Sequence, residues 1–260
     1  MNTKTLSARA LSIIDQYKDF SIGKAVCSVP YFNNKTTRTR GALRAFTGKG
    51  SPRDIYEEVI ASLTKEHVAI DALTSESLKK YLTDKNIGID CSGLAYYILN
   101  AESEKRSSGS LDKHIRFINC HGLIGKIKSA LRPVEHCDVA TLADNKNSKL
   151  ITLKDVLPGD MITMVSKSNA RNHILVINGV DMQNSDPTKI FYTHTIAYPE
   201  DGVYGTGSKQ GTIDLLSKSD MSYDSDIEKK TEILRYAWSE TNLFSKMKDY
   251  TVEIRRLNWF

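Results

Sequence analysis

One cysteine in this chain stands where a protein would place a nucleophile. Residues 90–93 have the sequence Asp-Cys-Ser-Gly, between an extended segment at 86–89 and an apolar, helix-like run at 94–99. At a helix N-terminus, unpaired backbone N–H groups and the positive end of the helix dipole favour a thiolate. The thiolate is the nucleophilic form, so Cys91 is a candidate for covalent catalysis. The alternative interpretation is a buried thiol on an apolar helix.

A cysteine nucleophile needs a base, and two histidines stand on neighbouring predicted strands. His173 opens the apolar run 173–177, and His194 lies in the next run, 190–196. Adjacent antiparallel strands can bring two such imidazoles close together, and one ring can then fix the tautomer of the other. Either histidine alone would be more typical of a structural role. The pair, following a helix-start cysteine, favours a catalytic base with an orienting partner more strongly than either histidine does alone.

These side chains need helices and strands to position them, and the periodicity predicts both. Helical spacing of apolar residues occurs at 6–17, and a second helix is expected to start at Ser51, as its N-cap, and Pro52. Further helices are expected at the following segments: 75–82 and within 115–131. Short strands separated by turns are expected at the following segments: 161–165, 173–177, 190–196, 211–215, 232–238 and 251–257. A helical half followed by such strands predicts an α+β fold with an antiparallel sheet.

Four segments resemble the NlpC-type (NlpC/P-sixty) family of papain-like cysteine peptidases, in the order of that family. They are Gly-Ile-Asp-Cys-Ser-Gly-Leu at 88–94, Leu-Pro-Gly-Asp-Met-Ile at 157–162, His-Ile-Leu-Val-Ile at 173–177 and Tyr-Thr-His at 192–194. The resemblance covers roughly residues 87–197, less than half of the chain. It implies a papain-like fold, in which the nucleophile helix packs on an antiparallel sheet, here with an N-terminal helical extension.

The resemblance also implies roles for individual residues. Cys91 would be the nucleophile, His173 the base and His194 its orienting partner. Asp90 and Ser92, beside the cysteine, would hold a free α-amine of the substrate. The family's upstream Tyr-x-x-Gly-Gly-like context is missing, so the stand-in lining tyrosine would be Tyr31 or, as a second choice, Tyr81.

The activity implied is a thiol hydrolase that cleaves amide bonds in small peptides, such as the γ-D-glutamyl bond of peptidoglycan stem peptides. No metal or organic cofactor is expected for this mechanism. The family's export signal and wall-binding repeats are not found, which separates this chain from typical cell-wall members. Two other hypotheses stay open: an acyl or amide transferase on the same triad, and a catalytically silent binding module with the same fold.

Organisation and partners follow from the whole sequence. We expect one domain, with an N-terminal helical region and basic loop at 1–86 and a hydrolase core at 87–260 that carries an insertion at about 101–150. A net charge of +5 lacks the dense basic footprint of a nucleic-acid binder. No apolar run is long enough to span a membrane, and no signal peptide is evident. The predicted location is cytoplasmic, unless export follows a route that the sequence does not declare.

Three other features carry weaker hypotheses. Basic residues in the segment from Phe20 to Gly50 predict either a solvated loop or a rim that binds substrate carboxylates or phosphates. Those considered are Lys35, Arg38, Arg40, Arg44 and Lys49. The Gly-Lys-Gly-Ser sequence at 48–51 lacks the order of a phosphate-binding P-loop. The pairs Cys120-His121 and His136-Cys137 lack the internal spacing of common structural zinc sites, so core or surface positions are favoured.

Overall fold

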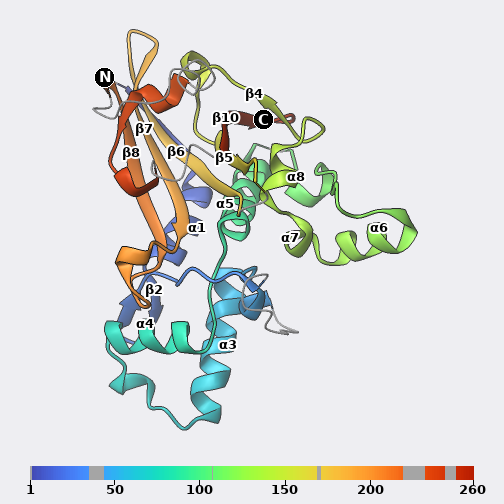
Figure 1. Ribbon diagram of the computed structural model, residues 1–260. Helices are drawn as coiled ribbons and strands as arrows, with labels where there is room; N and C mark the ends of the chain where they lie inside the picture. Colours follow the sequence, from blue (N-terminus) through green and yellow to red (C-terminus); the bar gives the residue numbers. More distant parts are fainter. Residues whose placement is uncertain (1, 35–43, 107, 169–170, 219–231, 244–249) are drawn as a thin grey trace.

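The computed structural model describes the chain except for residues 1, 35–43, 107, 169–170, 219–231 and 244–249. The described part is α+β, as expected: a large antiparallel sheet with helices packed beside it (Figure 1). The main sheet has the strand order β4-β10-β5-β6-β7-β8-β9, and β1 pairs with the second half of β6. A separate two-stranded sheet joins β2 and β3.

The strands have the following bounds: β1 Asn2–Thr5, β2 Phe20–Ile22, β3 Ala25–Cys27, β4 Ser148–Leu150, β5 Met161–Ser166, β6 His173–Gln183, β7 Asp186–Ile196, β8 Gly207–Lys218, β9 Tyr236–Trp238 and β10 Tyr250–Leu257. The helices are α1 Ala8–Lys18, α3 Pro52–Lys65, α4 Ser75–Asp84, α5 Cys91–Lys105, α6 Gly122–Leu131, α7 Pro133–His136 and α8 Val139–Ala143. Short 3-10 turns occupy Arg44–Thr47, Ile70–Ala72, Leu111–Lys113, Leu153–Asp155, Pro199–Asp201 and Glu232–Arg235.

Alternation along the central strands separates two hydrophobic cores. In β6, Ile174 and Val176 belong to the core that contains residues of α1 and α5, whereas Leu175 and Ile177 belong to the core on the other face. Successive side chains of a strand point to opposite faces, so a continuous apolar run is what a strand covered on both faces requires. Helix α5, which begins at Cys91, therefore covers one face of β6, and the second core covers the other.

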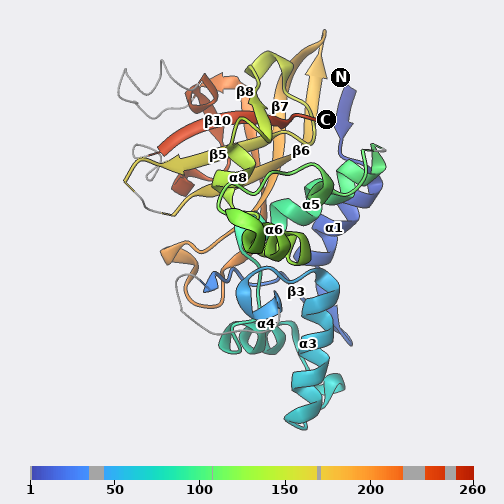
Figure 2. The same ribbon diagram turned by 90° about the vertical axis from the view of Figure 1, so that its right-hand side faces the viewer.

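The N-terminal region contributes to the same structure as the C-terminal half. Strand β1 extends the main sheet, and α1 packs beside α5 (Figure 2). The backbone N–H of Ser7, the N-cap of α1, donates to the Glu102 carboxylate of α5 at 2.9 Å. One hydrophobic core thus contains residues from both parts of the chain.

Most elements expected from the periodicity are present. The helix expected at Pro52 begins there, with a reciprocal capping box in which Ser51 Oγ accepts from the Asp54 N–H at 3.0 Å and Asp54 Oδ2 accepts from the Ser51 N–H at 2.9 Å. The strand expected from Glu232 is wrong in its first half. Residues 232–235 form a 3-10 turn, which buries the adjacent Ile233 and Leu234 together and leaves only 236–238 as strand.

Candidate functional site

The helix that carries Cys91 begins as the sequence predicts. Asp90 is the N-cap of α5, and its Oδ1 accepts from the Gly93 N–H at 2.6 Å. Gly93 is a packing requirement, because a Cβ there would lie 2.7 Å from Gly48 O and 2.8 Å from Ile89 Cδ1. The Asp-Cys-Ser-Gly sequence is therefore explained locally by one cap and one close backbone approach, with the cysteine as the first helical residue.

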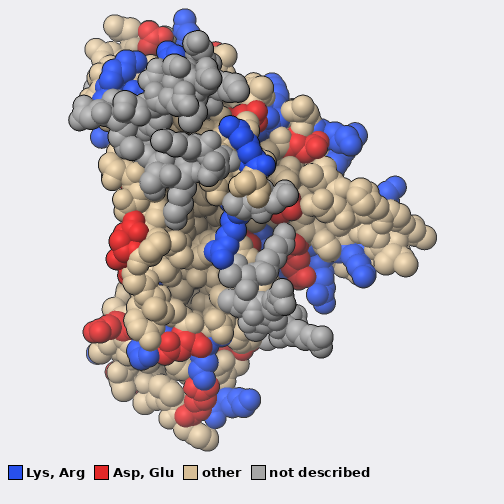
Figure 3. All heavy atoms as spheres, viewed as in Figure 1, with Lys and Arg blue, Asp and Glu red and all other residues tan. Residues whose placement is uncertain are grey.

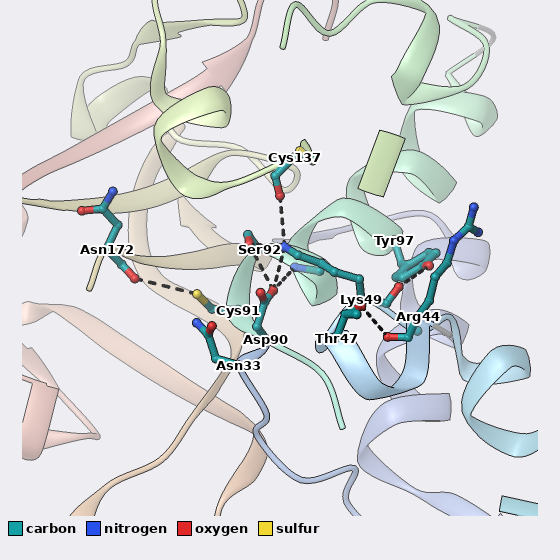
Figure 4. Close-up of polar contacts among 12 residues, drawn as sticks. Asn33, Arg44, Thr47, Lys49, Asp90, Cys91, Ser92, Tyr97, Cys137 and Asn172 are labelled. Carbon is teal, nitrogen blue, oxygen red and sulfur yellow. Dashed lines mark hydrogen bonds and ion pairs between the residues drawn. The ribbon is translucent and has the colours of Figure 1, made fainter. Parts of the chain in front are cut away.

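The Cys91 thiol is buried at the start of β6. Its residue is 6% exposed, and Sγ donates to the Asn172 carbonyl at 4.0 Å (Figure 4). Burial, and then the Asp90 charge, raise the pKa of Cys91 to about 12, against the lowering effects of Lys49 and of the Ile174 and Ser92 N–H groups. The expectation that the helix N-terminus favours a thiolate is wrong for this state, because burial outweighs these effects and keeps the thiol protonated at neutral pH.

A buried lysine occupies the position predicted to receive a substrate amine. Lys49 Nζ donates to Asp90 Oδ1 at 2.9 Å, to Ser92 Oγ at 2.6 Å and to the Cys137 carbonyl at 3.1 Å (Figure 4). The side chains of Lys49 and Asp90 are only 9% and 10% exposed. Asp90 and Ser92 thus meet an ammonium group, as the resemblance implies, but it is one supplied by the chain itself.

The backbone around residue 48 delivers that lysine. Gly48 O accepts from the Asp90 N–H at 2.8 Å, and Lys49 forms a bridge with Ile89. Gly48 has φ +73°, and a Cβ there would lie 2.2 Å from Phe32 O, so the close approach requires glycine. The sequence analysis rejected residues 48–51 as a P-loop, and their observed role is to bring Lys49 beneath the start of α5.

A chain of hydrogen bonds joins the two predicted histidines to a carboxylate. His173 Nε2 and His194 Nδ1 are 2.8 Å apart, and His194 Nε2 lies 2.9 Å from Glu240 Oε2. Tyr192 OH donates to the same carboxylate oxygen at 2.9 Å. The pairing of His173 and His194 is what the strand order predicted. Glu240, which follows β9, was missed, and no local motif marks it.

The carboxylate determines which ring nitrogen is basic. Burial opposes ionisation of Glu240, but the hydrogen bond and charge of His194, helped by Tyr192, hold the Glu240 pKa below its usual value. Ionised Glu240 accepts a hydrogen bond from the His194 Nε2–H, so His194 Nδ1 carries no proton and accepts a hydrogen bond from the His173 Nε2–H. In that arrangement the His173 lone pair lies on Nδ1, the nitrogen that a general base would use.

The thiol and the imidazoles meet β6 at the same end of the strand but from different sides. His173 is the first residue of β6 and pairs with Met164 of the second core, and the His194 ring packs edge-on against Tyr192 of that core, 5.6 Å between centroids. Cys91 Sγ approaches the backbone of Asn172 from the α5 side. Proton transfer between the two groups therefore has to pass around the N-terminal end of β6.

The two tyrosines considered for the site lie in different places. Tyr31 forms a bridge with Ile89, two residues before Cys91. Burial, followed by the charge of the neighbouring Cys91, raises the pKa of Tyr31 to about 12. Tyr81, on α4, donates to Glu66 at 3.2 Å. Tyr31 is thus the tyrosine that adjoins Cys91.

The Pro-Gly-Asp turn is a structural element beside the site. Asp160 receives two hydrogen bonds from Arg256 of β10, at 2.7 and 2.8 Å, and one from the Leu157 N–H at 2.8 Å. Gly159 has φ +95°, a conformation that glycine adopts without strain. The turn fixes the entry to β5, next to the strand that begins with His173.

Arg44 and Lys49 of the basic segment, and Arg53 just beyond it, are paired within the chain. Arg44 Nε lies 3.8 Å from Glu135, Lys49 binds Asp90, and Arg53 binds the exposed Glu57 at 2.7 Å. Lys35, Arg38 and Arg40 lie outside the described residues. Lys49 is therefore a structural ion-pair member, and the substrate-binding rim stays a prediction.

No metal centre or membrane span is evident in the part of the chain that the structure describes. Cys137 is fully buried, and within the described ranges no three His, Cys, Asp or Glu side chains gather as they would around a metal ion. Among the same residues, no helix combines the length and apolar character needed to cross a bilayer.

Comparisons with protein-family models, curated proteins and solved structures find no match.

Proposed function

We propose that this chain is a cysteine hydrolase of amide bonds with a papain-like arrangement, in which Cys91 is the nucleophile, His173 the general base and His194 its orienting residue. The observation that carries the proposal is the hydrogen-bonded series His173–His194–Glu240, which ends at the strand terminus touched by the Cys91 thiol. A nucleophile, a base and a group that orients the base are the parts that covalent acyl transfer needs. Glu240 adds a partly buried negative charge that stabilises a protonated His pair.

The reaction follows from these positions. The thiol proton passes around the N-terminal end of β6 to His173 Nδ1 as Sγ attacks the amide carbonyl carbon, and backbone N–H groups at the start of α5 stabilise the oxyanion. The leaving amine takes the proton from His173 as the C–N bond breaks, which leaves a thioester. A water molecule then gives a proton to His173 and attacks the thioester, and the thiol recovers its proton.

The substrate is proposed to be a small peptide or other amide, of which a γ-D-glutamyl peptide is one example. Because Lys49 already neutralises Asp90 and binds Ser92, a substrate amine could use these two residues only by displacing a buried ammonium. We therefore expect the substrate to need no free α-amine. This separates the present proposal from the amine-anchored substrates that the sequence resemblance implied.

The test measures the reactivity of each cysteine. Alkylation by iodoacetamide would be followed at pH 6 and pH 8 by site-resolved mass spectrometry in the wild type, in His173→Ala and in His121→Ala, a control that removes an exposed histidine. Cys137 is the internal reference, because burial raises its pKa to about 12 as well. Both thiols are protonated at these pH values, so the expected difference comes from removal of the Cys91 proton by His173. We expect Cys91 to react at least tenfold faster than Cys137 at pH 8, and His173→Ala, but not His121→Ala, to abolish the difference.

Equal reactivity of Cys91 and Cys137, or an unchanged Cys91 rate in His173→Ala, would remove the catalytic assignment and favour a binding module. With a reactive Cys91 established, N-acetylated and free-amine γ-glutamyl and α-peptide amides would be compared by acyl-enzyme mass. Added amines then separate hydrolysis from transfer, because a transferase would form the new amide instead of the acid.

A further inference from the structure

Helix α6 carries an apolar face that the rest of the described chain does not cover. Leu123, Ile124, Ile127 and Leu131 are 76%, 71%, 51% and 71% exposed. Figure 1 shows α6 as the outermost element on its side of the molecule, away from the sheet, and Figure 3 shows the same projection as a mainly uncharged surface with scattered basic residues. Four large aliphatic side chains exposed together on one short helix are unusual for a surface that only faces water.

The arrangement around the helix is ordered. At about 100° per residue, the four aliphatic side chains fall within an arc of about 100°. Lys126 and Lys128, both exposed, lie on either side of this arc, and the buried Ser129 lies opposite its centre. The helix therefore packs on the protein through its polar side and presents outward an apolar stripe with a lysine along each edge.

The charge on this surface has one sign. The sequence of α6, Gly-Leu-Ile-Gly-Lys-Ile-Lys-Ser-Ala-Leu, has no acidic residue, and the exposed Arg132 follows it. The next carboxylate along the chain, Glu135, lies 3.3 Å from Arg132 and 3.8 Å from Arg44. A partner that covers the apolar stripe therefore meets cations on both edges and should carry negative charge there.

We propose that α6 binds the surface of an anionic lipid bilayer, with its axis in the plane of the interface. The aliphatic side chains would enter the boundary of the acyl chains, while Lys126 and Lys128 extend outward to the phosphates, as long cationic side chains do at interfaces. A bilayer suits a convex, projecting helix, whereas a protein partner would need a matching groove with acidic rims on both sides. The proposal is independent of the chemistry at Cys91.

Binding to vesicles tests it directly. The purified full chain would be sedimented with sucrose-loaded vesicles of phosphatidylcholine and phosphatidylglycerol at 70:30, and with vesicles of phosphatidylcholine alone. We expect binding to the anionic vesicles that weakens with salt, at least tenfold weaker binding for Leu123→Glu/Ile127→Glu, and about fivefold weaker binding for each lysine removed in Lys126→Ala and Lys128→Ala. The matched controls are Leu150→Glu and Leu216→Glu, which change exposed leucines elsewhere and should bind like the wild type.

Because the changed side chains are exposed, circular dichroism and the unfolding midpoint should match the wild type, so lost binding would not reflect lost folding. Failure of the wild type to bind anionic vesicles would overturn the proposal, as would equal binding to phosphatidylcholine alone. Sedimentation equilibrium measures the oligomeric state and tests whether a second copy of the chain covers the apolar stripe instead. A wild-type dimer that Leu123→Glu/Ile127→Glu dissociates would replace the bilayer with a second copy of this chain.

Discussion

The buried Lys49–Asp90 pair gives the sharpest stability prediction. Lys49→Met keeps most of the aliphatic stem but removes the ammonium, and leaves Asp90, 10% exposed, with hydrogen bonds only from Ser92 and Gly93 among its described contacts. Breaking a buried ion pair by removing one partner costs about 3–5 kcal/mol, because the other charge stays buried without compensation. We therefore expect Lys49→Met to lower the free energy of unfolding by about 3–5 kcal/mol, measured by urea denaturation followed by circular dichroism.

The matched partner is Asp90→Asn, which keeps the helix cap because asparagine caps as well as aspartate. The Lys49→Met/Asp90→Asn double variant should lose less than the sum of the two single losses, since it contains no unpaired charge. Additivity within about 0.5 kcal/mol, or a Lys49→Met loss below about 1 kcal/mol, would refute the inference that the pair is buried and coupled.

A complementary measurement tests whether the site of the Lys49 ammonium, beside Asp90 and Ser92, binds an amine from solution. Lys49→Ala removes three carbons and the ammonium, which n-propylammonium replaces. A ligand that binds only the folded state stabilises it by about 2.7 kcal/mol at a concentration 100 times its Kd. We expect n-propylammonium, but not n-propanol, to raise the unfolding midpoint of Lys49→Ala and to leave the wild type unchanged.

Three further predictions follow from neighbouring contacts. Glu240→Gln keeps an acceptor for His194 but removes the charge. Alkylation of Cys91 at pH 7 should then slow by about tenfold or more, since hydrogen bonds to charged groups contribute about 1.5–3 kcal/mol. An unchanged rate would exclude Glu240 from positioning the histidines, and Glu57→Gln, at an exposed carboxylate, is the control. Burial raises the pKa of Cys137 to about 12, so this thiol contributes its full stabilisation below about pH 8.5 and progressively less above it. Between pH 8 and 10.5 the free energy of unfolding of the wild type should fall by about 2 kcal/mol more than that of Cys137→Ala. Parallel pH dependences of the two free energies would contradict the raised pKa. Gly93→Ala should lower the free energy of unfolding by about 1–3 kcal/mol despite the higher helix propensity of alanine, because the new Cβ would meet Gly48 O. A raised unfolding midpoint would show that the backbone moves easily to relieve this contact.

Local sequence patterns predicted much of the architecture because their causes are local. The cap at Ser51 and Asp54 satisfies N–H groups of the same helix turn, and the alternating or continuous apolar runs select strands whatever they pair with. The order of the strands around His173 and His194 follows from a single antiparallel hairpin, so their proximity could also be predicted. The strand prediction for residues 232–235 was wrong because the burial of adjacent apolar residues in a turn depends on neighbours distant in sequence.

What the sequence by itself determined is the helix start at Cys91, the antiparallel sheet and the pairing of the two histidines. The tertiary structure decided the electrostatics of the site: Lys49 reaches Asp90 across 41 residues, and Glu240 reaches His194 across 46. It also decided the protonation of Cys91, since the depth of burial outweighs the effect of the helix terminus. Ion pairs and desolvation depend on which distant segments surround a group, and no local spacing encodes that.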